Sequence, residues 1–206
     1  TFARGLHRAY RRMERREWRH WQGGELQGST VTIVGLGAIG TTLAERLSGW
    51  DLHTVGVRYT PAKGGPTDEV VGFDEDAVHD AFARSDYVVV ACPLTETTAH
   101  LVDEATLATM DPHAVLVNVA RGGVVDTDAL VDALQTGQIR GAALDVTDPE
   151  PLPAEHALWT LENCLVTPHV GGSTPRHWER MADVVADDVA ALEAGGGFRN
   201  LVVAPE

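Results

Sequence analysis

Residues 30–40 read TVTIVGLGAIG, a run of mostly β-branched residues followed by three glycines. Gly35, Gly37 and Gly40 have the spacing G-x-G-x-x-G, and they lie between a predicted strand and a predicted helix. In that context Gly35 allows a tight turn, Gly37 lets the backbone approach a pyrophosphate, and Gly40 permits close packing of helix on strand. The helix that begins near Ala38 directs its N–H groups and positive dipole at the phosphates. The stretch predicts dinucleotide binding; a glycine-rich turn is the alternative.

Strand-like and helix-like segments alternate along the rest of the chain. Strands are expected at 31–34, 52–57, 87–93, 114–120, 141–146 and 164–170, helices at 39–47, 73–86, 103–110, 126–137 and 173–197, and a loop at 60–72. Such alternation predicts an α/β fold, a Rossmann-like doubly wound parallel sheet with helices on both faces. The strands are nearly continuous apolar runs, as expected when both faces of a sheet are covered.

The charge balance is strongly acidic, with 30 acidic residues, 16 basic residues and a net charge of −14. Lys63 is the only lysine, and the other basic residues are arginines. An acidic surface with so little lysine suggests adaptation to high salt, where repulsion is screened over a few Å. It also argues against nucleic-acid binding by the body of the protein.

The first 20 residues are the basic exception. They hold seven arginines and two glutamates, a net charge of +5, which leaves −19 for the other 186 residues. Residues 4–21 place apolar side chains near helical spacing, so a helix is expected that ends at the glycine pair 23–24. We expect this helix to lie on an acidic surface of the protein itself or of a partner subunit; a nucleic-acid arm is the alternative.

The cysteines, the apolar runs and the spacing of possible metal ligands indicate the cellular compartment and limit the possible chemistry. Cys92 and Cys164, the only cysteines, lie in apolar runs, which predicts buried free thiols in a reducing compartment such as the cytoplasm. No apolar run of about 18 residues and no signal-peptide pattern occurs, so no membrane partner is expected. Neither a His-x-x-x-His nor a Cys-x-x-Cys pattern occurs in the sequence, so no metal site is expected.

Polar and charged residues gather where four predicted strands end, the edge at which such sheets bind ligands. The segments are CPLTETT (92–98), NVARGG (118–123), LDVTDPEP (144–151) and TPHVGG (167–172). Arg121, Glu150 or His169 alone would have an ordinary surface explanation. Together, at successive strand ends beside a nucleotide site, the three indicate an active site.

These four segments, in this order, resemble the D-isomer-specific 2-hydroxyacid dehydrogenases, relatives of phosphoglycerate dehydrogenase, glyoxylate/hydroxypyruvate reductase and formate dehydrogenase. The resemblance covers residues 26–197. It implies that Arg121 binds the substrate carboxylate and carbonyl, and that Glu150 pairs with the acid–base residue His169. It also implies that Asp145 contacts the nicotinamide end of the cofactor. Formate enzymes carry Gln where Glu150 stands, so the chain departs from them.

The resemblance implies reversible reduction of 2-keto acids to D-2-hydroxy acids, with a nicotinamide cofactor, in a homodimer. It further implies that residues 1–25 are an inter-domain and dimerisation helix, that 26–197 are the dinucleotide-binding domain, and that 198–206 begin the return to a substrate domain absent from this chain. The alternative is a nucleotide-sensing, corepressor-like binding protein of the same fold. A purely structural domain does not account for the three candidate catalytic residues.

Arg58 stands 18 residues after Gly40, where NAD-specific relatives place an aspartate that binds the adenine ribose. A guanidinium there can pair with a 2′-phosphate, and Tyr59 and Thr60 add hydroxyl donors. The sequence therefore predicts a preference for NADP(H), with NAD(H) and a solvent-facing arginine as the alternative. The candidate cofactor-binding residues are Gly35, Gly37, Ala38, Ile39, Gly40, Arg58, Tyr59, Thr60, Cys92, Pro93, Thr98, Val119, Ala120, Asp145 and Gly171.

Overall fold

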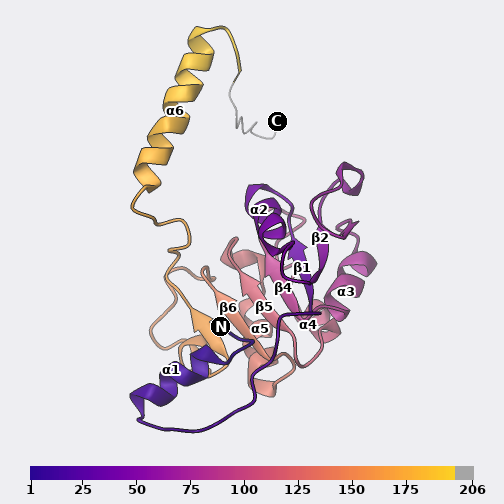
Figure 1. Ribbon diagram of the computed structural model, residues 1–206, viewed down its shortest axis with the longest axis vertical. Coiled ribbons are helices and arrows are strands. Elements are labelled where there is room, and N and C mark those ends of the chain that lie inside the picture. Colours follow the sequence, from indigo (N-terminus) through magenta and orange to yellow (C-terminus); the bar gives the residue numbers. More distant parts are fainter. Residues whose placement is uncertain (198–206) are drawn as a thin grey trace. The chain divides into compact units, whose positions relative to one another are not determined.

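Seven parallel strands form one sheet in the order β3-β2-β1-β4-β5-β6-β7 (Figure 1). The computed structural model describes residues 1–197. The strands are β1 (Thr30–Val34), β2 (His53–Val57), β3 (Glu69–Val71), β4 (Tyr87–Val90), β5 (Val115–Asn118), β6 (Gly141–Leu144) and β7 (Cys164–Val166). This topology confirms the expected Rossmann-like α/β class.

Helices or 3₁₀ turns lie between successive strands, as parallel pairing requires, and one further helix precedes the first strand and another follows the last. The helices are α1 (Leu6–Glu14), α2 (Ala38–Leu47), α3 (Glu75–Ala83), α4 (Glu104–Thr109), α5 (Thr127–Thr136) and α6 (His177–Glu193), with 3₁₀ turns η1 (Pro61–Lys63), η2 (Gly122–Val124) and η3 (Ala157–Trp159). The chain divides into two compact units, residues 1–168 and 169–206, and α6 belongs to the second.

The first and last residues of the helix predicted at 126–137 cap the two ends of α5. The carboxylate of Asp126 accepts a hydrogen bond from the N–H of Ala129 at 3.0 Å, and Gly137 takes the left-handed conformation with φ 72°. A side-chain acceptor satisfies one of the free N–H groups at a helix start, and glycine enters the left-handed region without a Cβ penalty. These two residues fix α5 between β5 and β6.

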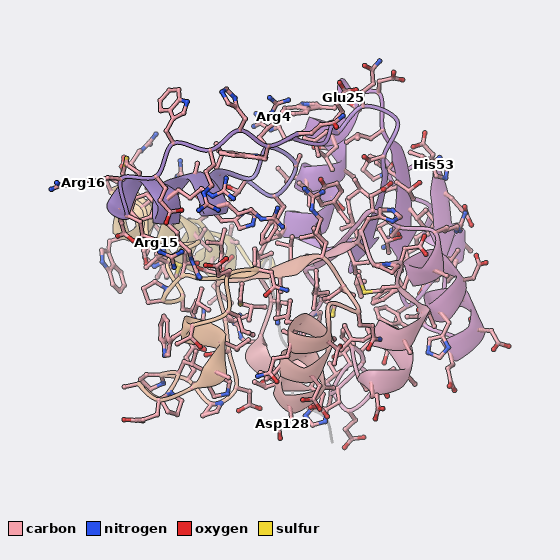
Figure 2. The ribbon with its side chains drawn as sticks, turned by 90° about the horizontal axis from the view of Figure 1, so that it is seen from below. Arg4, Arg15, Arg16, Glu25, His53 and Asp128 are labelled. Atoms are coloured by element: carbon pink, nitrogen blue, oxygen red, sulfur yellow. The ribbon has the colours of Figure 1, made fainter. Side chains whose placement is uncertain are left out.

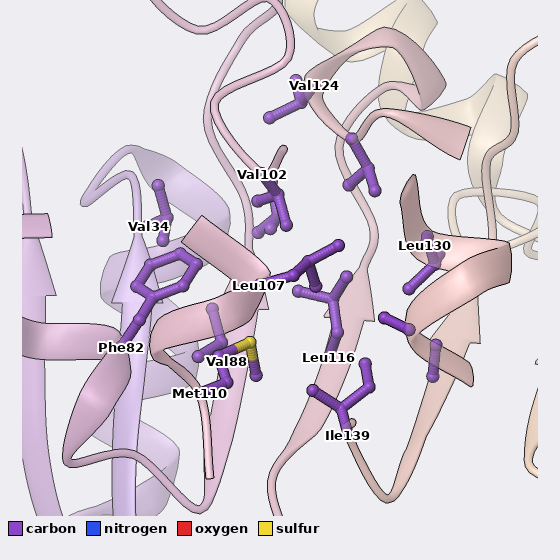
Figure 3. Packing of buried hydrophobic residues seen from close by; sticks show 14 of the residues in the cluster. Val34, Phe82, Val88, Val102, Leu107, Met110, Leu116, Val124, Leu130 and Ile139 are labelled. Carbon is purple, nitrogen blue, oxygen red and sulfur yellow. The ribbon is translucent and has the colours of Figure 1, made fainter. Parts of the chain in front are cut away.

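Adjacent residues of β1 face opposite sides of the sheet, and each side has its own core. Val34 packs in the larger cluster with Phe82 of α3 and Leu107 of α4, which Figure 3 shows at close range. Ile33 packs on the other side with Ala44 of α2. Both β1 side chains are fully buried. The centre of the sheet is therefore held by helices on both faces.

Within the first unit, the burial of strand residues varies from one face of the sheet to the other. Val89, Val117 and Leu165 lie on β4, β5 and β7 and are only half-buried, while their neighbours Val88 and Leu116 are fully buried.

The expected N-terminal helix is shorter than predicted, because α1 ends at Glu14 and not near residue 23. Arg16 takes a left-handed conformation with φ 56°, and the chain turns back there. The indole N–H of Trp21 then donates to the carbonyl of Arg4, and its ring lies 5.1 Å from the Arg12 guanidinium. Figure 2 shows Arg15 and Arg16 at the end of α1. These contacts replace the last turns of the predicted helix.

The predicted loop at 60–72 was also wrong in part, because it contains η1 and strand β3. β3 is a three-residue edge strand that begins with an acid, a composition that disfavours a strand prediction. Pairing with β2 stabilises it, since the N–H of Arg58 donates to the carbonyl of Val71 at 3.0 Å. Similarly, the helix expected at 173–197 is shorter, because α6 runs from His177 to Glu193 and a turn at residues 175–176 precedes it.

The two thiols are free and buried, as predicted. Burial raises the pKa of Cys92 to about 11 and the pKa of Cys164 to about 12. In residues 1–197, no helix is long and apolar enough to cross a membrane, and no cluster of three or more His, Cys, Asp or Glu side chains is placed to hold a metal ion.

Candidate functional site

The strand order reverses at β1, which pairs with β2 on one side and with β4 on the other. Gly35 follows β1 and donates its N–H to the carbonyl of Val57 at 2.8 Å, while Ala91 donates to Val34 at 2.8 Å. These bonds bring the ends of three strands together at one edge. In open parallel sheets, ligands bind beyond the carboxyl ends of the strands at such a reversal.

The three motif glycines have different surroundings. Gly35 has φ +100°, and a Cβ there would lie 2.7 Å from the backbone of Cys92. A Cβ on Gly40 would collide with the carbonyl oxygen of Gly35. At Gly37, by contrast, an added Cβ would meet no other part of the described chain within 4 Å, and this glycine begins α2 without a side-chain cap. Open space at an uncapped helix start fits the pyrophosphate of a dinucleotide.

A cavity of about 200 Å³ lies beside this motif. Among the residues that line it, those predicted from the sequence are Gly35, Gly37, Arg58, Tyr59, Thr60, Cys92, Pro93 and Thr98. The sequence interpretation missed Leu36, Lys63 and Phe73, which line it too. A larger cavity, of about 710 Å³, lies between α1 and the segment that follows it and contains none of the predicted site residues.

An aromatic pair forms one part of the cavity lining. The Tyr59 ring lies 5.2 Å from the Phe73 ring, and the Tyr59 hydroxyl forms a hydrogen bond with the hydroxyl of Thr97. Thr98 is buried, and its hydroxyl donates to the carbonyl of Pro93 at 2.6 Å while it accepts the N–H of Thr95 at 2.8 Å. The hydroxyl of Thr98 therefore shapes the loop after β4, and Tyr59 connects that loop to the end of β2.

Arg58 reaches the cavity from the end of β2. Its guanidinium donates through Nη1 to the carbonyl oxygen of Gly64 at 2.5 Å. Gly64 has a positive φ of +61° with ψ −159°, a conformation that glycine adopts without a Cβ penalty. The loop after β2 is thereby folded back on Arg58, whose other nitrogen atoms remain as donors.

A second set of candidate residues follows β5 and β6. Asn118 fixes the turn, since its amide nitrogen donates to the carbonyl of Arg121 at 3.0 Å and its oxygen accepts the N–H of Ala120 at 3.0 Å. The exposed Arg121 side chain donates to the carbonyl of Ala120 at 2.6 Å. Asp145 follows β6 and accepts a hydrogen bond from the Thr167 hydroxyl at 2.6 Å. The turn therefore holds Val119, Ala120 and Arg121 at the carboxyl edge.

The remaining candidates are divided between the two units. Arg121, Asp145 and the exposed Glu150 belong to the first unit, which also holds the glycine motif. His169, with φ 51°, and Gly171 belong to the second. Within the first unit, the structure groups most of the cofactor candidates around the ends of β1, β2 and β4, and it places Val119, Ala120 and Asp145 after β5 and β6. Ala38, Ile39 and Gly40 form the first turn of α2.

Of the missed residues, Lys63 carried a signal in the sequence. It is the only lysine of the chain, in a glycine-rich and proline-rich loop after Arg58. Leu36 and Phe73 gave no such signal, because an apolar residue in a strand-flanking position has the same pattern whether it lines a cavity or fills a core. Their role in the lining follows from the tertiary fold.

Comparison with known families decides the identity. The model of the D-isomer specific 2-hydroxyacid dehydrogenase family, NAD binding domain, matches residues 1–171. The chain belongs to this family. As a 2-hydroxyacid dehydrogenase domain it binds NAD(P), and the resemblance seen in the four strand-end segments is confirmed.

Several relatives show the breadth of the family. A glyoxylate reductase from Pyrococcus furiosus is 39% identical over 173 residues, which cover 84% of this chain and 51% of the relative. A D-isomer specific 2-hydroxyacid dehydrogenase from Xanthobacter autotrophicus Py2, solved in complex with NADPH and MES, is 32% identical with a TM-score of 0.86 over 98% of this chain and 81% of that one. An NADPH-dependent glyoxylate/hydroxypyruvate reductase from Sinorhizobium meliloti, solved with NADP and sulfate, is 28% identical with a TM-score of 0.82 over 96% and 63%. The chain spans about half the length of the curated relatives it matches.

Proposed function

We propose that this chain is the cofactor-binding part of an enzyme that reduces 2-keto acids to D-2-hydroxy acids, reversibly, with NADP(H) as its preferred cofactor. Membership of the family supports the reaction class. The glyoxylate reductase from Pyrococcus furiosus supports a small 2-keto acid as substrate. The substrate and turnover belong to the whole protein, because the relatives are about twice as long as the matched region.

The presence of Arg58 in the cavity is the observation that carries the cofactor preference. Among residues 1–197, the lining of this cavity includes Arg58 and Lys63 and no acidic residue. A guanidinium pairs with a 2′-phosphate, whereas a carboxylate would repel it. The solved relatives that contain NADPH and NADP support the same preference. NAD(H) bound less specifically is the alternative.

The candidate catalytic residues follow from the family resemblance. The bound nicotinamide supplies the hydride. Arg121 suits a substrate carboxylate, because its planar guanidinium can donate two parallel hydrogen bonds. His169 is the candidate proton donor in reduction and proton acceptor in oxidation, and Glu150 favours its charged form. Asp145 is assigned to the nicotinamide end of the cofactor.

The oligomeric state and the location belong to the same proposal. Residues 1–25 are proposed as the inter-domain and dimerisation segment of a cytoplasmic homodimer. Tyr10, Met13 and Trp18 support this assignment, because they are 62%, 66% and 91% exposed and apolar. No nucleic acid or membrane is expected as a partner.

A panel of small 2-keto acids, assayed on the complete protein with NADPH and with NADH, tests the proposal. We expect turnover of at least one 2-keto acid, with kcat/KM higher for NADPH than for NADH. NADPH binding without turnover of any 2-keto acid would contradict the proposed enzymatic activity and favour a nucleotide-sensing protein. Turnover with a preference for NADH would contradict the cofactor assignment alone.

A further inference from the structure

The cavity beside the glycine motif contains a second cation that the family resemblance does not assign. Lys63 lines it together with Arg58, although the two residues are five positions apart in the chain. Lys63 is also the only lysine among 206 residues. The other 15 basic residues of the chain are all arginines, so the position of its single lysine at a ligand cavity is distinctive.

The backbone around Lys63 is fixed, although its side chain is exposed. It ends the 3₁₀ turn η1, where its N–H donates to the carbonyl of Thr60 at 3.0 Å. The next residue, Gly64, donates to Pro61 at 2.8 Å and accepts the guanidinium of Arg58 at 2.5 Å. Three hydrogen bonds thus hold the base of the lysine side chain beside the arginine.

The charges of the two cations are available to a ligand. Arg58 uses one donor on a neutral carbonyl, which leaves its positive charge uncompensated. Within residues 1–197, Lys63 has no ion pair and no side-chain hydrogen bond to another residue, and no acid lines the cavity. Two unpaired cations on a short, fixed loop repel each other and are stabilised together by one anion of charge −2.

We propose that Lys63 is the second cation of a 2′-phosphate subsite and a determinant of selectivity for NADP(H) over NAD(H). The inference rests on the proposed function, because it deepens the preference assigned to Arg58. Arg58 supplies directed donors from one side, while Lys63 supplies a mobile point charge that follows the phosphate. The Tyr59–Phe73 pair provides aromatic faces beside the same cavity.

Calorimetric titration of the protein with adenosine 2′,5′-bisphosphate and with 5′-AMP tests the subsite without turnover. In Lys63→Gln, we expect the affinity for the bisphosphate to fall by about 10-fold, the usual size of one charge-assisted contact at a partly exposed site. The affinity for 5′-AMP should change less than about 2-fold, because that ligand lacks the 2′-phosphate. Lys63→Arg should retain most of the affinity for the bisphosphate.

Arg46→Gln is the matched control, because Arg46 is exposed in the last turn of α2, does not line the cavity and carries the same charge. It should leave both affinities unchanged. Equal weakening of both ligands in Lys63→Gln, no weakening of either, or the same loss in Arg46→Gln would overturn the inference. A wild-type preference for NADPH that persists in Lys63→Gln would overturn it while the proposed function stands.

Amine labelling gives a second readout. Because Lys63 is the only lysine of this chain, a lysine-selective reagent such as trinitrobenzenesulfonate modifies one side chain in it, which peptide mass spectrometry identifies. We expect adenosine 2′,5′-bisphosphate to protect Lys63 and 5′-AMP at the same fractional saturation to leave it reactive. Equal protection by both ligands would contradict a contact with the 2′-phosphate.

Discussion

The guanidinium of Arg58 and the carbonyl of Gly64 are joined by a hydrogen bond of 2.5 Å that closes the loop after β2. Arg58 therefore has two separable roles, since it holds the loop and presents positive charge to the cavity. A substitution that removes the charge also removes the loop contact. Variants at this position must be chosen so that the two effects can be distinguished.

Arg58→Asp should reverse the cofactor preference. The carboxylate repels a 2′-phosphate and accepts hydrogen bonds from an unmodified ribose, so NADPH binding should weaken by about 1.5–3 kcal/mol, or roughly 10- to 150-fold. Arg58→Met is the control, because it loses the loop contact and the charge without adding an acceptor. It should weaken NADPH binding and leave NADH binding unimproved. Tighter NADPH than NADH binding in Arg58→Asp would contradict the assignment.

The motif glycines allow binding and folding to be separated. Gly37→Val adds atoms where none lies within 4 Å, so the melting temperature should change by less than about 3 °C, while dinucleotide affinity falls at least about 10-fold. Gly40→Val forces Cβ into the Gly35 carbonyl, and it should destabilise the fold by several kcal/mol. Thermal unfolding and cofactor titration measure both. Normal affinity in Gly37→Val would show that the pyrophosphate lies elsewhere.

His169→Gln in the complete protein should lower kcat by roughly 10²- to 10⁴-fold, the usual contribution of a general acid–base residue. His177→Gln, which changes another histidine of the same unit, should leave kcat within about 2-fold. NADPH affinity should be retained in both variants. A kcat for His169→Gln equal to that of the control would remove His169 from the proposed proton transfer.

Thermal unfolding should depend on salt. With a net charge of −14, repulsion destabilises the protein in dilute buffer, and at about 1 M salt the screening length falls to about 3 Å. We expect the melting temperature to rise as KCl increases from low to molar concentration. Titration with sucrose at constant ionic strength controls for general solute effects. A melting temperature that is flat or falls with KCl would exclude adaptation to high salt.

Stability should fall at mildly acidic pH because of His7. The ring is 5% exposed, lies 4.5 Å from the Phe2 ring, and has no hydrogen-bond partner for Nδ1 among the described residues. Burial, assisted by the charge of Arg8, lowers the pKa of His7 to about 4. The unfolded chain binds a proton near pH 6.5, so the free energy of unfolding decreases as pH falls from about 6.5 to 4, by at most about 3 kcal/mol.

His7→Leu should flatten this part of the pH profile, while His20→Gln, which changes an exposed histidine, should leave it unchanged. Chemical denaturation at pH 4, 5, 6 and 7 measures the slopes. The same slope in His7→Leu and in the parent protein would assign the pH dependence to other groups.

The sequence was sufficient for the parts of the fold that local patterns determine. The glycine spacing after β1 predicted the strand–turn–helix unit, and Asp126 and Gly137 predicted both ends of α5. The patterns failed where tertiary contacts decide. β3 forms because it pairs with β2, and α1 stops early because the segment up to Trp21 folds back on it. Lys63 lines the cavity because Arg58 closes the loop, a contact that no periodicity encodes.

The basic N-terminal segment makes the first unit an electric dipole. Residues 1–20 carry +5 and are fixed beside β7, where Arg11 donates to the carbonyl of Leu161 and Arg15 pairs with Glu162 at 3.3 Å. The other residues of this unit, 21–168, hold 22 acidic and 6 basic residues, a net charge of −16. Two copies in dilute buffer therefore attract when the basic end of one meets an acidic face of the other, even though both are anionic. Osmotic second virial coefficients should accordingly record this orientation-dependent attraction as ionic strength is lowered.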